Sequence, residues 1–238
     1  MKLAVIFIGT GKYLDFLPTW YDSCETYLVP NVEKEYYVFT DGELSNPPEN
    51  MIPYYQEHLS WPYITLHRWK IVLRAKEDLE KFDYVIFLDA DMRIVSEVSQ
   101  DDLLTDKKYI GVHHPCHYLQ MPPHDKFPGS FETNPNSKAK VSDDYNFEYY
   151  WQGCLWGGRV PHVLDMMKEL DSNTSLDGEN DYVAKWHDES HLNAFYSKHS
   201  SDVHTLGPQF AYPEVFSDYC NFDPIIVHLS KDNSKYQQ

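Results

Sequence analysis

The sequence predicts an α/β fold in which a doubly wound, mostly parallel sheet is flanked by helices. Short apolar runs of strand type alternate with longer segments whose apolar residues recur at helical spacing. Strands joined by helical crossovers pair in parallel, and ligands of such sheets bind at the carboxyl ends of the strands. The chain has 238 residues, of which 42% are hydrophobic, so it can bury a sizeable core.

The first hundred residues supply most of this alternation. The expected elements are a strand at Leu3–Ile8, a helix at Leu17–Leu28, a strand at Glu35–Asp41, an apolar stretch at Met51–Tyr55, a long helix at Pro62–Leu79 and a strand at Tyr84–Leu88. A glycine turn follows the first strand, and two aspartates follow the last one. Both groups lie at expected carboxyl ends, so they should face the same crevice.

The rest of the chain is less regular. Residues Pro115–Asn146 have no clear period, which indicates either a functional loop or partial disorder. The elements expected after it are a strand at Phe147–Gly158, a helix at Arg159–Leu170, a polar loop at Asp171–Tyr182, the start of a helix at Lys185–His199 and a fraying tail at Ser230–Gln238. No repeat or linker divides the chain, so a single domain over residues 1–238 is expected.

Charge and cysteine usage narrow the function classes. The formal net charge of −17 repels nucleic acid and anionic membranes, so neither is an expected partner. The four cysteines form no CxxC pair, which favours reduced thiols in a cytosol-like compartment. The apolar N-terminus lacks a cleavage site, and no apolar run is long enough for a membrane span. A cytoplasmic location is therefore expected.

The run "FDYVIFLDADM" drives an apolar strand into two acids, Asp89 and Asp91. Side chains alternate along a strand, so both carboxylates point to one side and Ala90 to the other. Two such carboxylates are stable neighbours if they share a cation, and oxygen ligands suit Mg²⁺ or Mn²⁺. Alternatively, acids at a strand end cap a helix or face water, because so short a motif often matches by chance.

A divalent ion at this pair would also solve a charge problem. A diphosphate that enters a chain of net charge −17 needs a counter-ion. A metal that bridges carboxylates to phosphates supplies one, and it stabilises a departing nucleoside diphosphate by the same attraction.

Four other stretches carry polar or aromatic groups that could bind a ligand: "FIGTGKY", "LSWPYITLHRWK", "YYWQGCLWGG" and "WHDES". Their structural alternatives are a plain βα turn, solvated helix charges, a core strand and a helix N-terminus with favourable acids. In the last stretch Asp188 and Glu189 are adjacent, so on a helix they diverge by about 100° and cannot share one role.

Together these stretches resemble glycosyltransferase family six, which holds the blood-group A and B transferases, α1,3-galactosyltransferases and bacterial relatives. The similarity covers most of the chain in the correct order, and "WHDESHLN" is its most specific part. The resemblance implies the GT-A fold, a UDP-sugar donor and a galactoside-containing glycan as acceptor. It also implies retaining transfer of Gal or GalNAc to the 3-hydroxyl of that galactoside, with Mn²⁺, or Mg²⁺ in its place, held by Asp89 and Asp91.

The resemblance also assigns site residues. Glu189 matches the catalytic acid, and Trp186 and His187 should line the acceptor side. The donor and nucleotide positions are Ile8, Gly9, Thr10, Tyr13, Trp61, Arg68, Asp89, Ala90, Asp91, Trp151, Gln152, Gly153 and Asp188. Residues 1–100 would then hold mainly the donor, and residues 101–238 mainly the acceptor and the catalytic acid.

Several departures from the family refine these expectations. The membrane anchor of mammalian members is missing, which suggests a bacterial- or phage-like form, and both aspartates are kept, which predicts metal dependence. The donor-discriminating triplet aligns with Trp151-Gln152-Gly153, where Gly153 leaves space for an N-acetyl group although Trp151 could offset it. We therefore favour GalNAc over Gal. The basic tail that closes over the diphosphate is reduced to Lys231 and Lys235.

Two alternative functions stay open on the sequence alone. A metal-dependent UDP-sugar hydrolase or phosphoesterase would use water as the acceptor. A non-catalytic sugar-binding module would bind sugar without regard to UDP or Mn²⁺, and the paired aspartates argue against it because sugar stacking needs no metal. His228 either ends a strand or approaches the metal and phosphates.

Overall fold

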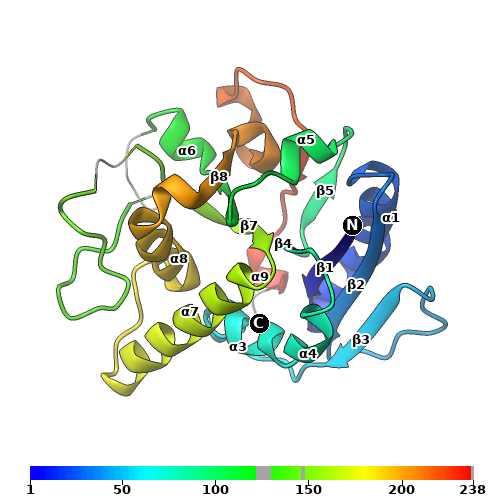
Figure 1. The fold of residues 1–238 in the computed structure, drawn as a ribbon, viewed down its shortest axis with the longest axis horizontal. Helices are drawn as coiled ribbons and strands as arrows, with labels where there is room; N and C mark the ends of the chain where they lie inside the picture. The colour runs from blue at the N-terminus through cyan, green and yellow to red at the C-terminus, as the bar shows by residue number, and fades with distance from the viewer. Residues whose placement is uncertain (122–129, 146–147, 237–238) are drawn as a thin grey trace.

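The computed structural model describes residues 1–121, 130–145 and 148–236 and confirms the predicted α/β architecture (Figure 1). A seven-stranded sheet has the order β3-β2-β1-β4-β7-β6-β8. Its strands are β1 (Lys2–Ile8), β2 (Glu33–Thr40), β3 (Met51–Tyr55), β4 (Tyr84–Leu88), β6 (Tyr109–His113), β7 (Trp151–Arg159) and β8 (Val203–Leu206). Only β7 runs antiparallel to its neighbours β4 and β6, and the other pairs are parallel.

Both faces of the sheet are covered, as doubly wound folds require. Alternate residues of β1 enter two separate cores: Leu3, Val5 and Phe7 pack with α1 (Leu17–Tyr27), whereas Ala4 and Ile6 pack on the other side. The second core holds side chains of α3 (Arg68–Leu73), α7 (His162–Glu179) and α8 (His187–Lys198). Helices α3 and α7 lie side by side (Figure 1).

A second, three-stranded sheet has the order β5-β10-β9 and lies next to the end of β4. Its strands are β5 (Met92–Ile94), β9 (Tyr212–Pro213) and β10 (Ile226–His228). The remaining helices are α2 (Tyr63–Leu66), α4 (Lys76–Leu79), α5 (Gln100–Leu103), α6 (Pro115–Tyr118) and α9 (Asn233–Tyr236), with 3-10 turns at Gly11–Phe16, Ser200–Asp202, Pro208–Ala211 and Glu214–Tyr219. Because β10 pairs with β5, the C-terminal residues are brought to the aspartates that follow β4.

The long helix expected at Pro62–Leu79 is wrong, because the chain forms the three short helices α2, α3 and α4 instead. The backbone leaves the helical region at His67, where φ is −97° and ψ is 11°. Thr65 donates its hydroxyl to the carbonyl of Pro62, and Arg68 Nε donates to the carbonyl of Thr65. Such side-chain bonds compete with the helical ladder. The stretch Pro62–Leu79 contains no glycine or internal proline that would predict the break.

The polar loop expected at Asp171–Tyr182 is also wrong, because α7 continues to Glu179. The reason is that this polar stretch has a buried face. Asp177 is 2% exposed and accepts hydrogen bonds from Ser137 Oγ at 2.6 Å and from the Lys138 amide at 2.7 Å. The helix therefore anchors a segment of the excursion between β6 and β7 rather than ending in solvent.

Part of the irregular excursion Pro115–Asn146 is ordered, and the rest of it lies outside the described residues. It begins with the short helix α6. Glu132 is buried and accepts hydrogen bonds from the amides of Asn134 and Lys185 and from the Tyr182 hydroxyl. The strand expected at Phe147–Gly158 is confirmed from Trp151 onward but is wrong for residues 148–150, which form no strand, and its expected start at Phe147 lies outside the described residues.

The tail that was expected to fray folds back onto the N-terminal half as far as Tyr236. The short helix α9 brings the Tyr236 ring within 5.4 Å of Tyr13 and 5.3 Å of Phe16, measured between centroids. None of the helices among the described residues has the length and apolar character that crossing a membrane requires.

The packing of β7 against β4 predicts a large difference between two glycines. A Cβ at Gly157 would lie 2.4 Å from the Val85 carbonyl oxygen, whereas a Cβ at Gly178 in α7 would meet no atom within 4 Å. Gly157→Ala should lower the free energy of unfolding by about 2 kcal/mol or more. Gly178→Ala should leave it unchanged or raise it by up to about 1 kcal/mol. Urea unfolding followed by tryptophan fluorescence measures both, and equal stabilities would contradict this packing.

Candidate active site

A cavity of about 210 Å³ opens at the carboxyl ends of β1 and β4, as the sequence predicted. It is lined by Ile8, Thr10, Tyr13, His58, Leu59, Trp61, Ile64, Thr65, Arg68, Phe87, Asp89, Ala90, Asp91, His228, Lys231 and Tyr236. The glycine turn and the aspartate pair therefore face the same crevice. Gly9 supports this wall from behind, because its amide donates to the Phe39 carbonyl at 3.0 Å and a Cβ there would lie 2.4 Å from the Phe7 ring.

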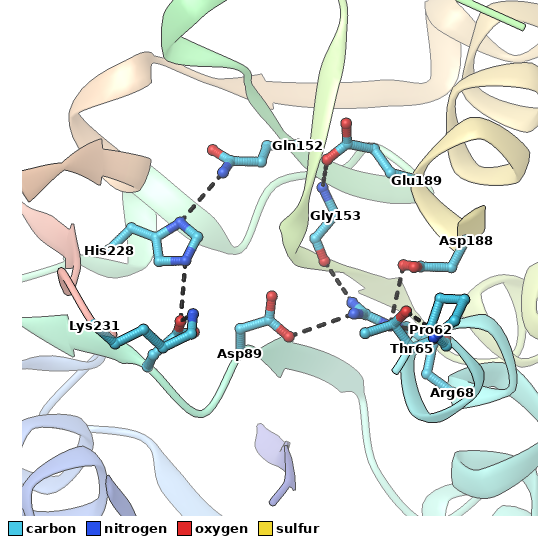
Figure 2. A network of polar contacts seen from close by, with 11 residues as sticks. Pro62, Thr65, Arg68, Asp89, Gln152, Gly153, Asp188, Glu189, His228 and Lys231 are labelled. Carbon is cyan, nitrogen blue, oxygen red and sulfur yellow. Dashed lines mark hydrogen bonds and ion pairs between the residues drawn. The ribbon is translucent and has the colours of Figure 1, made fainter. Parts of the chain in front are cut away.

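Arg68 is a buried cation that joins three elements at the cavity wall (Figure 2). One guanidinium nitrogen donates to the Gly153 carbonyl at 2.7 Å. The guanidinium also forms ion pairs with Asp188 Oδ2 at 3.1 Å and with Asp89 Oδ1 at 3.5 Å. The break after His67 thus delivers Arg68 to the end of β4, to β7 and to the start of α8 at once.

The two aspartates of the pair have different electrostatic surroundings. Burial raises the pKa of the Asp89 carboxyl above its ordinary value, even though Arg68 opposes this. Burial acts in the same direction on Asp91, but the cations beside it prevail and hold its pKa below the ordinary value. Those cations are His228, whose Nε2 lies 3.2 Å from Asp91 Oδ2, and Lys231, whose ammonium contacts the same oxygen.

The aspartates offer a donor set that fits a divalent metal shared with a substrate. Mg²⁺ and similar hard cations use one or two carboxylates and complete their coordination with water and substrate phosphates. Within residues 1–121, 130–145 and 148–236 no group of three His, Cys, Asp or Glu side chains is arranged to hold a metal alone. Asp89 and Asp91 could therefore hold such an ion only together with water or a ligand.

Glu189 is held by two hydrogen bonds at the first turn of α8. The Tyr150 hydroxyl donates to Oε1 at 2.7 Å, and the Gly153 amide donates to Oε2 at 2.8 Å. Burial raises the pKa of Glu189 to about 7, although both hydrogen bonds stabilise the charged form. The carboxyl is thus fixed in position and can exist in both protonation states near neutral pH.

Adjacent acids on α8 take different roles in the packing, as the helical geometry predicted. Asp188 turns toward Arg68, whereas Glu189 turns toward the amide of Gly153 (Figure 2). Both lie in the first turn, where the helix dipole also favours negative charge. The structural interpretation of this motif, acids at a helix N-terminus, is therefore confirmed, and its role in substrate binding stays a prediction.

The residues predicted for the acceptor side lie at the entry to α8. His187 has a φ of +50°, and its ring meets the half-exposed Trp61 ring edge-on at 4.8 Å. The Trp186 amide donates to Ser190 Oγ at 2.9 Å, and its indole donates to Ser130 Oγ at 3.2 Å. Trp61 lines the cavity, so His187 stands at its edge. Contact with an acceptor stays a prediction for both residues.

The three residues of the predicted donor-discriminating triplet, Trp151, Gln152 and Gly153, lie in different surroundings. The Trp151 side chain is fully buried in the core, where its indole donates to Thr205 Oγ1 at 2.9 Å, so the structure does not bring it to the cavity. Gln152 lies beside the site with its amide nitrogen 3.3 Å from His228 Nδ1 (Figure 2). Gly153 is central, because its amide binds Glu189 and its carbonyl binds Arg68.

Sequence reasoning missed Tyr150 and the cavity-lining His58 and Tyr236. Tyr150 and its neighbour Tyr149 look equivalent in the sequence, since both precede the strand. Only the crossing of β7 and α8 determines which hydroxyl reaches Glu189. His228 ends β10, as one of the two expectations for it had it, and also contacts Asp91, whereas its approach to a metal or to phosphates stays a prediction. Lys231 lines the cavity, whereas Lys235 pairs with Asp232 on the surface.

Comparison with known proteins identifies the class to which this fold and site belong. The model for "Glycosyltransferase family 6" matches residues 1–231, so the chain belongs to that family. The O-antigen biosynthesis glycosyltransferase WbnI of Escherichia coli is 28% identical over 99% of this chain and 97% of its own length. The human globoside α-1,3-N-acetylgalactosaminyltransferase 1 is 26% identical over 90% of this chain. The rat histo-blood group ABO system transferase 2 is 26% identical over 85% of it.

The chain covers about 62% of the human relative and 61% of the rat relative. The resemblance to the family that the motifs indicated is therefore confirmed over nearly the whole sequence. Membership supports glycosyl transfer from a sugar donor to a glycan acceptor, whereas it leaves the identity of the donor, the linkage and the metal to experiment.

The hydrogen bonds of Glu189 predict how its acidity responds to a neighbouring substitution. Tyr150→Phe removes a donor that stabilises the carboxylate, so the pKa of Glu189 should rise by about one pH unit. Tyr149→Phe is a matched control that keeps the Tyr150 hydroxyl. Carbon-13 NMR titration of labelled glutamate carboxyls measures the shift, with Glu189→Gln to assign the signal. An unchanged titration in Tyr150→Phe would contradict the hydrogen-bond geometry.

Proposed function

We propose that this protein is a retaining, metal-dependent glycosyltransferase that moves GalNAc, or Gal, from a UDP-sugar in α1,3 linkage to a galactoside. The observation that carries the proposal is the buried guanidinium of Arg68, a cavity-lining side chain that pairs both with Asp89 at the end of β4 and with Asp188 at the start of α8. This contact would join the proposed donor site to the helix turn that carries the proposed catalytic carboxyl.

The relatives support the choice of sugar and linkage. The name of the human relative specifies α-1,3 transfer of N-acetylgalactosamine, and the rat relative is a histo-blood group transferase. Gly153 has no side chain, and a Cβ there would lie 3.3 Å from Asp188 Oδ2. A side chain at this position would crowd the Asp188 carboxylate, which we assign to the donor sugar together with Arg68.

Binding of the nucleotide is assigned to the β1 side of the cavity. The backbone at Ile8–Thr10, with the rings of Tyr13 and Trp61, would enclose the uridine. Lys231 lies over the Tyr13 ring at 5.4 Å and supplies a positive charge for the diphosphate. Because the whole chain is strongly acidic, such local cations are needed to offset its electrostatic repulsion of an anionic ligand.

Asp89 and Asp91 are the residues that would hold Mn²⁺, or Mg²⁺ in its place. The ion, when bound, would stabilise the negative charge that develops on the departing UDP. His228 and Lys231 hold the pKa of the Asp91 carboxyl below its ordinary value, which favours the charged form that binds a cation. The pairing of Asp89 with Arg68 keeps that side chain directed at the same end of the cavity.

Glu189 is assigned to the reacting centre. In its ionised form it would stabilise positive charge at the anomeric carbon from the face opposite the leaving group. Tyr150 and the Gly153 amide orient the carboxylate and favour its charge. The acceptor would approach past Trp186 and His187. Protonation near pH 7 removes the charge, so the transfer rate should fall as the pH falls through about 7.

A UDP-release assay over a panel of UDP-sugars, with and without Mn²⁺ and a galactoside, tests this proposal. Release should be largest with UDP-GalNAc, should need the metal and should rise with the galactoside. Asp91→Asn should lose the response to Mn²⁺ and at least about 100-fold of the rate, as expected when a charge-stabilising group is lost. Asp106→Asn removes a charge from a fully exposed side chain and should change nothing.

Two results would contradict the proposal. Release that ignores every added galactoside would identify a UDP-sugar hydrolase instead. A manganese titration that is the same in Asp91→Asn and in the unaltered protein would remove the aspartate pair from the metal assignment.

A further inference from the structure

A buried carboxylate outside the cavity, that of Glu132, has no part in the proposed function. Glu132 is 4% exposed. Its Oε1 accepts a hydrogen bond from the Asn134 amide at 2.8 Å, and its Oε2 accepts from the Tyr182 hydroxyl at 2.8 Å and from the Lys185 amide at 2.9 Å. Glu132 therefore joins the excursion between β6 and β7 to the last residues before α8.

The hydrogen bonds keep Glu132 charged although it is buried. Burial acts to raise the pKa of this carboxyl, but the bonds from the Asn134 amide, the Lys185 amide and the Tyr182 hydroxyl prevail and hold it below its ordinary value. A buried charge is costly unless its hydrogen bonds are kept. The carboxylate therefore fixes the Lys185 amide, and with it the backbone that enters α8.

Helix α8 begins with an uncommon backbone conformation two residues after Lys185. His187 has a φ of +50°, in the left-handed region that residues other than glycine seldom occupy. Such a conformation persists only where the surrounding structure imposes it. Ser130 of the same excursion accepts a hydrogen bond from the Trp186 indole at 3.2 Å. Together with Glu132, it holds the chain on the N-terminal side of His187.

The turn at His187 sets the directions of the two acids that follow it. Asp188 reaches Arg68 at 3.1 Å, and Glu189 reaches the Gly153 amide at 2.8 Å (Figure 2). Adjacent side chains on a helix diverge by about 100°, so their directions are set together by the backbone from which they leave. A different turn at His187 would move both carboxyls.

We propose that Glu132 is a positioning residue for the reaction: its carboxylate imposes the left-handed turn at His187 and thereby holds Glu189 against the Gly153 amide. The inference rests on the proposed function, because it takes Glu189 as the carboxyl at the reacting centre. Glu132 is not among the described residues that line the cavity, so it acts on the reaction through α8.

Hydrogen exchange of the Gly153 amide, followed by NMR, tests this positioning without any turnover. Glu132→Gln replaces one acceptor oxygen by an amide group that only donates. The Gly153 amide should then exchange about tenfold faster, as expected when one hydrogen bond is lost. The Trp151 amide, which donates to Asn193 Oδ1 at 2.8 Å one turn further along α8, should keep its exchange rate.

Kinetics and nucleotide binding give a second readout. Glu132→Gln should lower kcat at least about tenfold, because the catalytic carboxyl is displaced. The Kd of UDP should stay within about twofold, because the β1 side of the cavity is unchanged. Ser137→Ala is the matched control, since Ser137 joins the same excursion to Asp177 of α7 at 2.6 Å. It should lower the Tm but leave kcat and the exchange of Gly153 unchanged.

Tyr182→Phe provides a milder variant in case Glu132→Gln does not fold. It keeps the carboxylate and removes one of its donors. The exchange of Gly153 and kcat should change in the same directions by about two- to threefold. Where only this variant folds, an unchanged exchange of Gly153 in it overturns the inference.

Two results would overturn the positioning role of Glu132. One is an exchange rate of Gly153 in Glu132→Gln that equals that of the unaltered protein. The other is a Ser137→Ala variant that changes kcat and the exchange of Gly153 as much as Glu132→Gln does, because the excursion would then be a general structural support. Faster exchange of Gly153 in a protein that transfers sugar to no acceptor would count against the proposed function alone.

Discussion

The buried guanidinium of Arg68 is the interaction on which the rest of the site depends. A charge removed from water is costly unless it is paired and hydrogen-bonded. Arg68 is 4% exposed and is compensated by Asp188, Asp89 and the Gly153 carbonyl. These partners come from α8, from the end of β4 and from β7, so one side chain sets the position of all three. The same Gly153 holds Glu189 through its amide, which extends the constraint to the candidate catalytic carboxyl.

The distribution of charge around this centre bears on how so acidic a chain could bind the phosphate-bearing donor that we propose. The net charge is −17, yet Arg68, Lys231 and His228 lie against the acids of the cavity. Lys231 and His228 come from the C-terminal part of the chain, which reaches the site because β10 pairs with β5. Membership of glycosyltransferase family 6 and this local balance of charge point to the same activity, although they rest on independent observations.

The sequence predicted the features that follow from short-range patterns. Apolar runs placed β1 and β4, and the rule for parallel sheets brought the glycine turn and Asp89 to one cavity. Features set by contacts between distant segments could not be predicted. The break at His67 brings Arg68 to partners in distant segments, and the extension of α7 accompanies the buried contacts of Asp177. The family resemblance predicts Trp151 at the donor, yet strand alternation turns its side chain into the core.

A double-mutant cycle on Arg68 and Asp188 tests most directly whether the buried ion pair holds the site together. The free energy of unfolding is measured for the unaltered protein, Arg68→Met, Asp188→Asn and the double variant. Breaking one partner of a buried pair leaves the other uncompensated, so we expect each single variant to lose about 3 kcal/mol and the coupling to be about 2 kcal/mol or more. A coupling below about 0.5 kcal/mol would show that the two side chains act independently, and would contradict the central role of Arg68.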